Sequence, residues 1–248
     1  VYRYGRLAGH NPSVETLAAL RAEPNVMLWV DLSAPTDEEI KRILETLFAF
    51  HPLAIEDCVS DSPLPKFEEY DDYLYLVMHA VDYTRLEKFT TTELDFFLGK
   101  SFLVTFHRQP LKSVQATLAR CLKPLAPLLR GPDRLTHTLL DFMVEHYQPA
   151  LDELRRDLEK IEDAVLHSAP AGDLFHRVIE LRKELATLRQ ITRPQREVVA
   201  ALAQGPNRFF RLTLQPGLRD LRTDLTRIEE QANAWAEQLI LTFRIFLN

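Results

Sequence analysis

The amino-acid sequence predicts an α+β fold. We expect an N-terminal domain with a mixed sheet in an α/β/α arrangement, followed by an antiparallel helix hairpin and one long stalk helix. Strand-like and helix-like stretches alternate as far as residue 131, and strand signals stop after Gly131-Pro132. The last thirty residues carry an uninterrupted helical stripe. The predicted parts are therefore an α/β domain at residues 1–131, a helical hairpin at 132–204 and a long helix at 205–248.

The composition is that of an ordinary globular protein large enough to bury a core. The 248 residues are 46% hydrophobic and 27% charged. A net charge of −6 disfavours a general nucleic-acid binder. Two cysteines are too few for a disulfide framework, which favours a reducing compartment. We find neither a signal peptide nor an apolar run of the ~18 residues that a membrane span needs, so the chain as given is expected to be soluble.

A strand and the helix after it are the first predicted elements. Val26–Leu32 reads as the strand. Thr36 begins the helix, and Glu39 three residues later completes a capping box. Its apolar positions recur at helical spacing and predict a buried face of Ile40, Ile43, Leu44, Leu47 and Phe48.

A central strand and a hairpin complete the predicted sheet. Residues 73–83 are apolar on both faces, which indicates a strand that is covered on both sides. Residues 93–98 and 101–107 flank Gly99-Lys100, a two-residue turn in which the glycine is expected to take a positive φ. This hairpin is the one antiparallel pair that we expect.

The helical part begins after Gly131-Pro132. A helix opening near Leu135 should be kinked or interrupted at Pro149. The next helix runs from Asp173 past Pro194 to about Leu202, and the two helices are expected to form an antiparallel hairpin.

The stalk helix has a heptad-like stripe that needs a partner, either another helix or another subunit. The stripe is formed by Leu218, Leu221, Leu225, Ile228, Ala232, Trp235, Leu239, Thr242 and Phe246. Residues 239–248 are apolar nearly all round, with no cap after them. We interpret them as the start of a membrane segment, with the stem packing beside copies of itself. The alternative is a C-terminal helix buried in its own domain.

Six short motifs stand in order along the chain. They are residues 29–32 (WVDL), 51–57 (HPLAIED), 65–68 (PKFE), 139–141 (LLD), 181–183 (LRK) and 194–197 (PQRE). Together they resemble the cytosolic part of CorA-type divalent-cation channels, a family with magnesium channels and ZntB-type zinc transporters. The resemblance covers nearly the whole chain. The family's Gly-Met-Asn signature does not occur in it.

The resemblance implies the cytosolic regulatory domain of a homopentameric Mg²⁺ channel or transporter at the cytoplasmic face of the inner membrane. Zn²⁺ or Co²⁺ are the alternative transported ions. The implied partners are further copies of the chain and, through missing C-terminal helices, the membrane. Neither an enzymatic activity nor a nucleic-acid partner is implied.

Three acids match the region that senses cytosolic magnesium in the family. Glu56 and Asp57 are adjacent at the end of a short helical segment, and Asp141 matches a further acid. Several carboxylate oxygens suit a hard divalent cation, although adjacent acids are more often a solvated turn. The sequence departs from the family where a stalk-helix aspartate is expected, because no acid lies between Glu197 and Asp220.

Arginines stand where that acid is missing. We expect Arg208 or Arg211 of one subunit to lie near Asp57 of its neighbour, so that a guanidinium replaces the cation. At the other end of the stalk, Glu237 and Asn248 are eleven residues apart and share a helix face. The resemblance places both facing the pore, where rings of oxygens attract hydrated cations. The alternative is a solvated Glu and a frayed terminal Asn.

Three other functions compete with this reading. For a ZntB-like zinc domain, the scattered histidines and the lone Cys58 form none of the paired spacings that zinc sites use. A metal-dependent hydrolase would need a nucleophile elbow, a P-loop or an HExxH motif, and none is found. A soluble helical scaffold is supported by the helices but not by the apolar tail.

Overall fold

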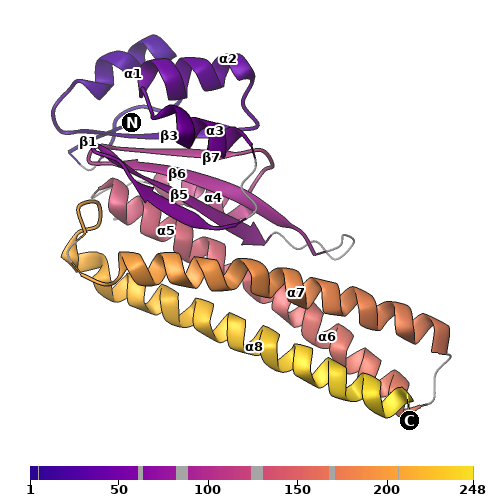
Figure 1. The fold of residues 1–248 in the computed structure, drawn as a ribbon. Helices are drawn as coiled ribbons and strands as arrows, with labels where there is room; N and C mark the ends of the chain where they lie inside the picture. The colour runs from indigo at the N-terminus through magenta and orange to yellow at the C-terminus, as the bar shows by residue number, and fades with distance from the viewer. Residues whose placement is uncertain are drawn as a thin grey trace.

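The computed structural model describes residues 1–4, 6–60, 64–81, 89–123, 131–167, 171–205 and 207–247. These residues form a head, which is one sheet with helices α1 to α5 on its two faces, and an arm, which is made of helices α6, α7 and α8 (Figure 1). The N-terminus lies in the head and the C-terminus at the far tip of the arm. The predicted fold class is confirmed.

The described strands form one seven-stranded sheet with the order β2-β1-β3-β7-β6-β5-β4. Their bounds are β1 Tyr2–Arg3, β2 Arg6–Leu7, β3 Val26–Ser33, β4 Lys66–Glu69, β5 Tyr73–Val81, β6 Thr91–Gly99 and β7 Phe102–His107. Every residue of β5 is buried, as expected for a central strand. The expectation of a single antiparallel pair is wrong. Among the described strands only β3 and β7 pair in parallel, because β4 to β7 follow one another as a meander.

Helices cover both faces of the sheet and share its core. One face carries α1 Val14–Arg21, α2 Asp37–Ile40, the π-helical η1 Lys41–Leu47 and α3 Pro52–Val59. The other carries α4 Lys112–Cys121 and α5 Pro132–Glu145. The arm consists of α6 Tyr147–Leu166, α7 Ala171–Leu202, the 3₁₀ turn η3 Leu212–Leu214 and α8 Gln215–Leu247. The buried cluster under the sheet continues into the arm, so the three-part division of the chain stays a prediction.

Of two local predictions, one is confirmed and one is wrong. The capping box is confirmed: the Thr36 hydroxyl accepts a hydrogen bond from the Glu39 amide at 3.3 Å, and the Glu39 carboxylate accepts one from the Thr36 amide at 2.8 Å. The positive φ expected at Gly99 is wrong. A side chain there would place its Cβ 2.3 Å from the ring of Phe102, so close packing, not backbone conformation, requires glycine.

Two prolines mark the helical part as predicted. The helix interruption falls at His146, between α5 and α6, so that Pro149 sits in the first turn of α6, where its missing N–H breaks no hydrogen bond. Pro194 lies inside α7, which continues past it to Leu202.

The stripe of α8 is covered by helices of the same chain. Its members Leu218, Leu221, Leu225, Ile228, Ala232 and Leu239 are buried against α5, α6 and α7. The stripe therefore has α7 and its neighbours as partners within the chain, and the packing of the stem beside copies of itself stays a prediction. The opposite side near the tip stays exposed, with 48% of Ile240, 58% of Leu241 and 69% of Ile245 accessible. None of the helices in the described ranges is both long and apolar enough to span a bilayer.

Candidate cation site

Helix α3 presents its two acids to solvent on different sides. His51 caps the helix by accepting a hydrogen bond from the Leu53 amide at 3.2 Å, and Pro52 takes the first helical position. Ala54, Ile55 and Cys58 are buried against the sheet. Because neighbouring helix positions are about 100° apart, Glu56 and Asp57 then face outward in different directions. Glu56 is exposed and Asp57 is half-buried.

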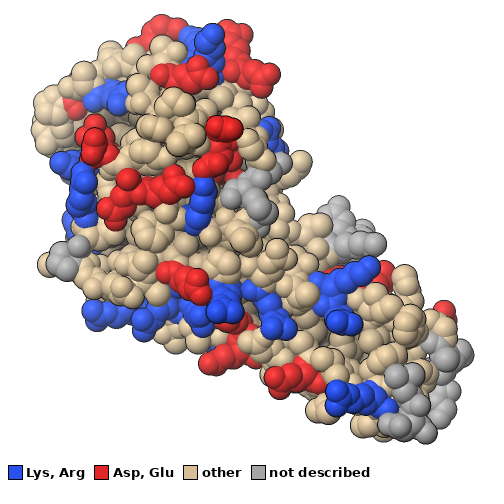
Figure 2. All heavy atoms as spheres, in the orientation of Figure 1, with Lys and Arg blue, Asp and Glu red and all other residues tan. Residues whose placement is uncertain are grey.

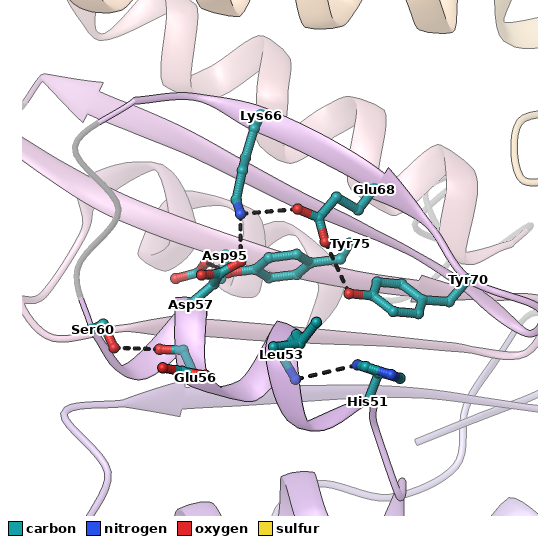
Figure 3. A network of polar contacts seen from close by, with 10 residues as sticks. All are labelled: His51, Leu53, Glu56, Asp57, Ser60, Lys66, Glu68, Tyr70, Tyr75 and Asp95. Atoms are coloured by element: carbon teal, nitrogen blue, oxygen red, sulfur yellow. Dashed lines mark hydrogen bonds and ion pairs between the residues drawn. The ribbon is translucent and has the colours of Figure 1, made fainter.

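Asp57 has a partner in its own chain. The Lys66 ammonium donates a hydrogen bond to the Asp57 carboxylate and another to Glu68 Oε1 at 3.0 Å. Tyr70 in turn donates its hydroxyl proton to Glu68 Oε2 at 2.9 Å. Lys66 and Glu68 are two residues apart on β4, so both side chains point to the α3 side of the sheet (Figure 3). The arrangement is one ammonium between two carboxylates.

The two carboxylates stabilise the protonated forms of Lys66 and Tyr70. Burial by itself would lower the pKa of Lys66, but the hydrogen bonds to Asp57 and Glu68 outweigh it and raise that pKa. Burial, and then the hydrogen bond to Glu68, raises the pKa of Tyr70. Lys66 is 33% exposed and Asp57 39% exposed, so solvent screens the pair and its contribution to stability is on the order of 0.5–1 kcal/mol.

Glu56 belongs to a different hollow. It lines an open groove of about 710 Å³ between α2–η1 and α3, together with Asp37 and Glu45. Its carboxylate has no hydrogen-bond partner among the described residues, whereas its backbone carbonyl accepts a bond from the Ser60 hydroxyl at 2.6 Å. Glu56 and Asp57 therefore do not converge on one point.

Asp141 is separated from both by the sheet. It lies on α5, on the opposite face from α3. It lines a cleft of about 230 Å³ against α8 with Glu145, Asp224 and Arg227, where Asp224 and Arg227 form an ion pair at 2.9 Å. Within the described part of the chain no three His, Cys, Asp or Glu side chains are grouped so that they could hold a metal ion. In one copy, the three acids Glu56, Asp57 and Asp141 therefore do not form a common cation site.

The two arginines before α8 contact their own chain. Arg211 donates three hydrogen bonds to the Asp133 carboxylate: from its backbone N–H at 3.2 Å, from Nε at 2.7 Å and from Nη2 at 2.6 Å. Asp133 is buried in the first turn of α5, where the helix dipole favours a negative charge, and its hydrogen bond raises the pKa of Arg211. Arg208 donates to the backbone carbonyl of Asp71 and lies over the ring of Phe209. The side chain of Arg211 as a whole is 50% exposed.

The sequence analysis did not identify Lys66 or Asp133 as site residues. For Lys66 a signal existed, because residues 66 and 68 in the 65–68 motif would share one face of a strand. For Asp133 the only local signal is an acid in the first turn of a helix, and its partner lies 78 residues away. Of the two pore-facing candidates, Glu237 is exposed on α8, and Asn248 lies outside the described residues.

The fold of this chain is shared with two solved domains of metal transporters. The structure superposes on the soluble domain of CorA from Methanocaldococcus jannaschii with a TM-score of 0.76 and 23% identity, covering 89% of this chain and 88% of that one. It superposes on the ZntB cytoplasmic domain from Vibrio parahaemolyticus with a TM-score of 0.73 and 14% identity, covering 87% and 84% of the two chains.

The family model described as "CorA-like Mg2+ transporter protein" matches residues 24–248. The chain therefore belongs to the CorA-like Mg²⁺ transporter family. It is 34% identical over 171 residues to the putative metal ion transporter YfjQ of Bacillus subtilis, covering 69% of this chain and 52% of that protein. It is 21% identical over 227 residues to the cobalt/magnesium transport protein CorA of Thermotoga maritima, covering 90% and 64%. The chain thus spans about half the length of YfjQ.

Proposed function

We propose that this chain is the cytosolic regulatory domain of a homopentameric divalent-cation transporter of the inner membrane, with Mg²⁺ as the transported ion. The observation that carries the proposal is the family match over residues 24–248 on a head-and-arm fold shared with transporter domains. The domain acts in transport and not as an enzyme. Zn²⁺ and Co²⁺ are the alternative ions, since relatives include a cobalt/magnesium transport protein and the fold is shared with a ZntB domain.

The acids that face outward in one copy are proposed to act between copies. Asp57 and Glu56 lie on the outer side of α3, and Asp141 lies in the cleft beside α8. A hard divalent cation takes six or more oxygen ligands, and carboxylates add more to its affinity than waters do, so ligands from a neighbouring copy would strengthen a site that has one carboxylate from each copy. In this protein Arg208 or Arg211 of the neighbour is proposed to take the place of the cation beside Asp57.

The surface charge supports contacts between head and arm of different copies. Acidic side chains gather on the visible face of the head, and Lys and Arg form a broken row along the arm (Figure 2). A density map of the complete oligomer tests the arginine proposal. Arg208 and Arg211 both lying beyond about 6 Å from every neighbouring Glu56 and Asp57 carboxylate would refute it, because that is the reach of a strong charge effect.

The ion and the role of Glu237 are tested together by uptake. We expect the complete transporter that contains this chain to accumulate Mg²⁺ when expressed in cells, with Zn²⁺ and Co²⁺ measured in parallel. Glu237 and Asn248 are proposed to face the pore, so Glu237→Ala should lower cation flux. Glu230→Ala, an exposed acid two turns earlier on α8, is the matched control. The absence of uptake of all three ions would refute the transport proposal, and unchanged flux in Glu237→Ala would refute the pore-facing role.

A further inference from the structure

The far tip of the arm carries a patch of exposed apolar side chains. Eleven large hydrophobic side chains are exposed in the described part of the chain, and five of them lie at this tip. We call these five the tip patch: Leu166 at the end of α6, Phe175 in the first turns of α7, and Ile240, Leu241 and Ile245 in the last turns of α8. A concentration of this kind marks a surface that contacts a protein or a membrane.

Contacts between the three helices fix the height of the tip patch on the arm. Gln238 of α8 donates a hydrogen bond to the Glu162 carboxylate of α6 at 2.5 Å. The ring of Phe175 on α7 lies with its centroid 5.8 Å from that of Phe243 on α8. Helices α6 and α8 both run from the head to the tip (Figure 1), and Leu166 lies four residues past Glu162, about 6 Å along the helix. The end of α6 and the start of α7 are therefore level with the last turns of α8.

This common height favours lipid as the partner of the tip patch. The last turns of α8 are apolar nearly all round, and under the proposed function they are the part of the chain that approaches the bilayer. Leu166 is 77% exposed and Phe175 is 52% exposed. Because their helices are packed against α8 at that height, both side chains reach the same membrane surface as α8 does.

The polar side chains around the tip patch set its depth. On the head side of the patch the acids Glu159, Asp163 and Glu237 are exposed, and an acid is costly below the lipid headgroups. Asp173 and Arg244 are exposed among the apolar side chains themselves. Such a mixture suits the boundary between headgroups and acyl chains, where amphipathic helices bury their apolar side about 5–10 Å deep. The tip patch therefore fits the membrane interface and not the hydrocarbon core.

We propose that the tip patch is a lipid-binding surface, in which Leu166 and Phe175 dock the α6–α7 end of the arm on the membrane interface beside the last turns of α8. This inference rests on the proposed function, since it needs α8 to lead toward a membrane. Binding at an interface scales with the apolar area that is buried, so two side chains align the arm against the bilayer and do not anchor it by themselves.

The test places an added tryptophan at the tip of the complete transporter, reconstituted in phosphatidylcholine vesicles. Bromine on the lipid acyl chains quenches an indole that touches them. We expect Leu166→Trp and Phe175→Trp to lose most of their added fluorescence in brominated vesicles, relative to unbrominated ones. Leu212→Trp is the matched control, because this leucine is 66% exposed at the head end of the arm, and its added fluorescence should stay unchanged. The wild-type signal, which includes Trp29 and Trp235, is subtracted.

Three results would overturn the inference, each with the thermal midpoint of the variant retained. An indole at position 166 or 175 that dissolved iodide quenches and bromine does not would show a tip open to water. An indole that neither quenches, with emission at short wavelength, would show a tip covered by protein, such as a second copy of the chain. Equal bromine quenching in Leu212→Trp would show that the signal does not come from the tip.

In each of these cases Mg²⁺ uptake into the same vesicles by the wild type would leave the proposed function standing. A wild-type transporter that takes up none of the divalent ions refutes the proposed function, whatever the quenching of the tryptophan variants shows.

Discussion

A buried hydrogen-bond network joins the sheet of this protein to its arm, and one hydroxyl group tests its importance. β4 begins at Lys66, opposite Val77, so among the described strands none pairs with the backbone of His79 on that edge of β5. Gln195 of α7 accepts a hydrogen bond from the His79 amide at 2.9 Å through Oε1. Tyr147 of α6 donates to the His79 carbonyl at 2.7 Å and accepts from Gln195 Nε2 at 2.6 Å. Two side chains thus replace the missing strand.

Tyr147→Phe removes only the hydroxyl from this network. The His79 carbonyl loses its donor and Gln195 Nε2 loses its acceptor, and both residues are almost fully buried, at 6% and 1% exposure. An unsatisfied buried polar group costs about 1–3 kcal/mol, so we expect the free energy of unfolding to fall by about 2–4 kcal/mol. For a chain of this size that is a fall in the melting temperature of roughly 5–15 °C.

Urea unfolding of the 248-residue chain, followed by circular dichroism, measures this change. Tyr4→Phe is the matched control, since Tyr4 is 82% exposed and its loss should cost within about 0.5 kcal/mol. A double-mutant cycle with Gln195→Met should give a coupling energy of about 1–2 kcal/mol. Additive effects of the two substitutions, or a Tyr147→Phe variant as stable as the control, would refute the reasoning.

Three further predictions follow from other contacts. Arg211→Met leaves the buried carboxylate of Asp133 without its main partner and should cost about 2 kcal/mol of unfolding free energy, reduced from a fully buried pair because Arg211 is half exposed. Gly99→Ala sets a methyl group against a neighbouring aromatic ring and should cost about 1–3 kcal/mol. The pKa of His107 is raised: burial by itself would lower it, but the hydrogen bond to Asp31 and the charge of that carboxylate outweigh burial. The stabilisation by this pair is therefore complete below the unfolded-state pKa, near ~6.5, and is lost as the pH rises through the folded-state value. Asp31→Asn should accordingly destabilise more at about pH 5.5 than at about pH 9. Denaturant titrations measure all three.

Each of these has its own control. Arg219→Met changes an exposed arginine on α8 and should be nearly neutral, so an equal loss there would contradict the role given to Arg211. Phe102→Leu should restore part of the stability lost in Gly99→Ala, and a failure to do so would place the clash elsewhere. The same loss at both pH values in Asp31→Asn would show that the charge on His107 contributes nothing.

The sequence proposed the acids Glu56, Asp57 and Asp141 as site residues, but it did not predict the groups that these and the two arginines contact. Asp57 was chosen from its motif, and its position on the outer side of α3 follows from the burial of Ala54, Ile55 and Cys58. That Lys66 faces it depends on how β4 lies against α3, and no local pattern specifies that packing. The adjacency of Glu56 and Asp57 suggested a pair, but on a helix adjacent side chains diverge.

The sequence by itself determined what depends on short-range periodicity and local backbone chemistry: the buried strand β5, the capping box at Thr36, the helix interruption before Pro149 and the apolar stripe of α8. Only the tertiary structure decided which distant groups meet. It closed the α8 stripe against α7, joined Arg211 to Asp133 across 78 residues, and set the ring of Phe102 over Gly99. The physical reason is that periods of 2 and 3.6 residues orient side chains about one element, whereas contacts between elements are selected by the packing of the whole core.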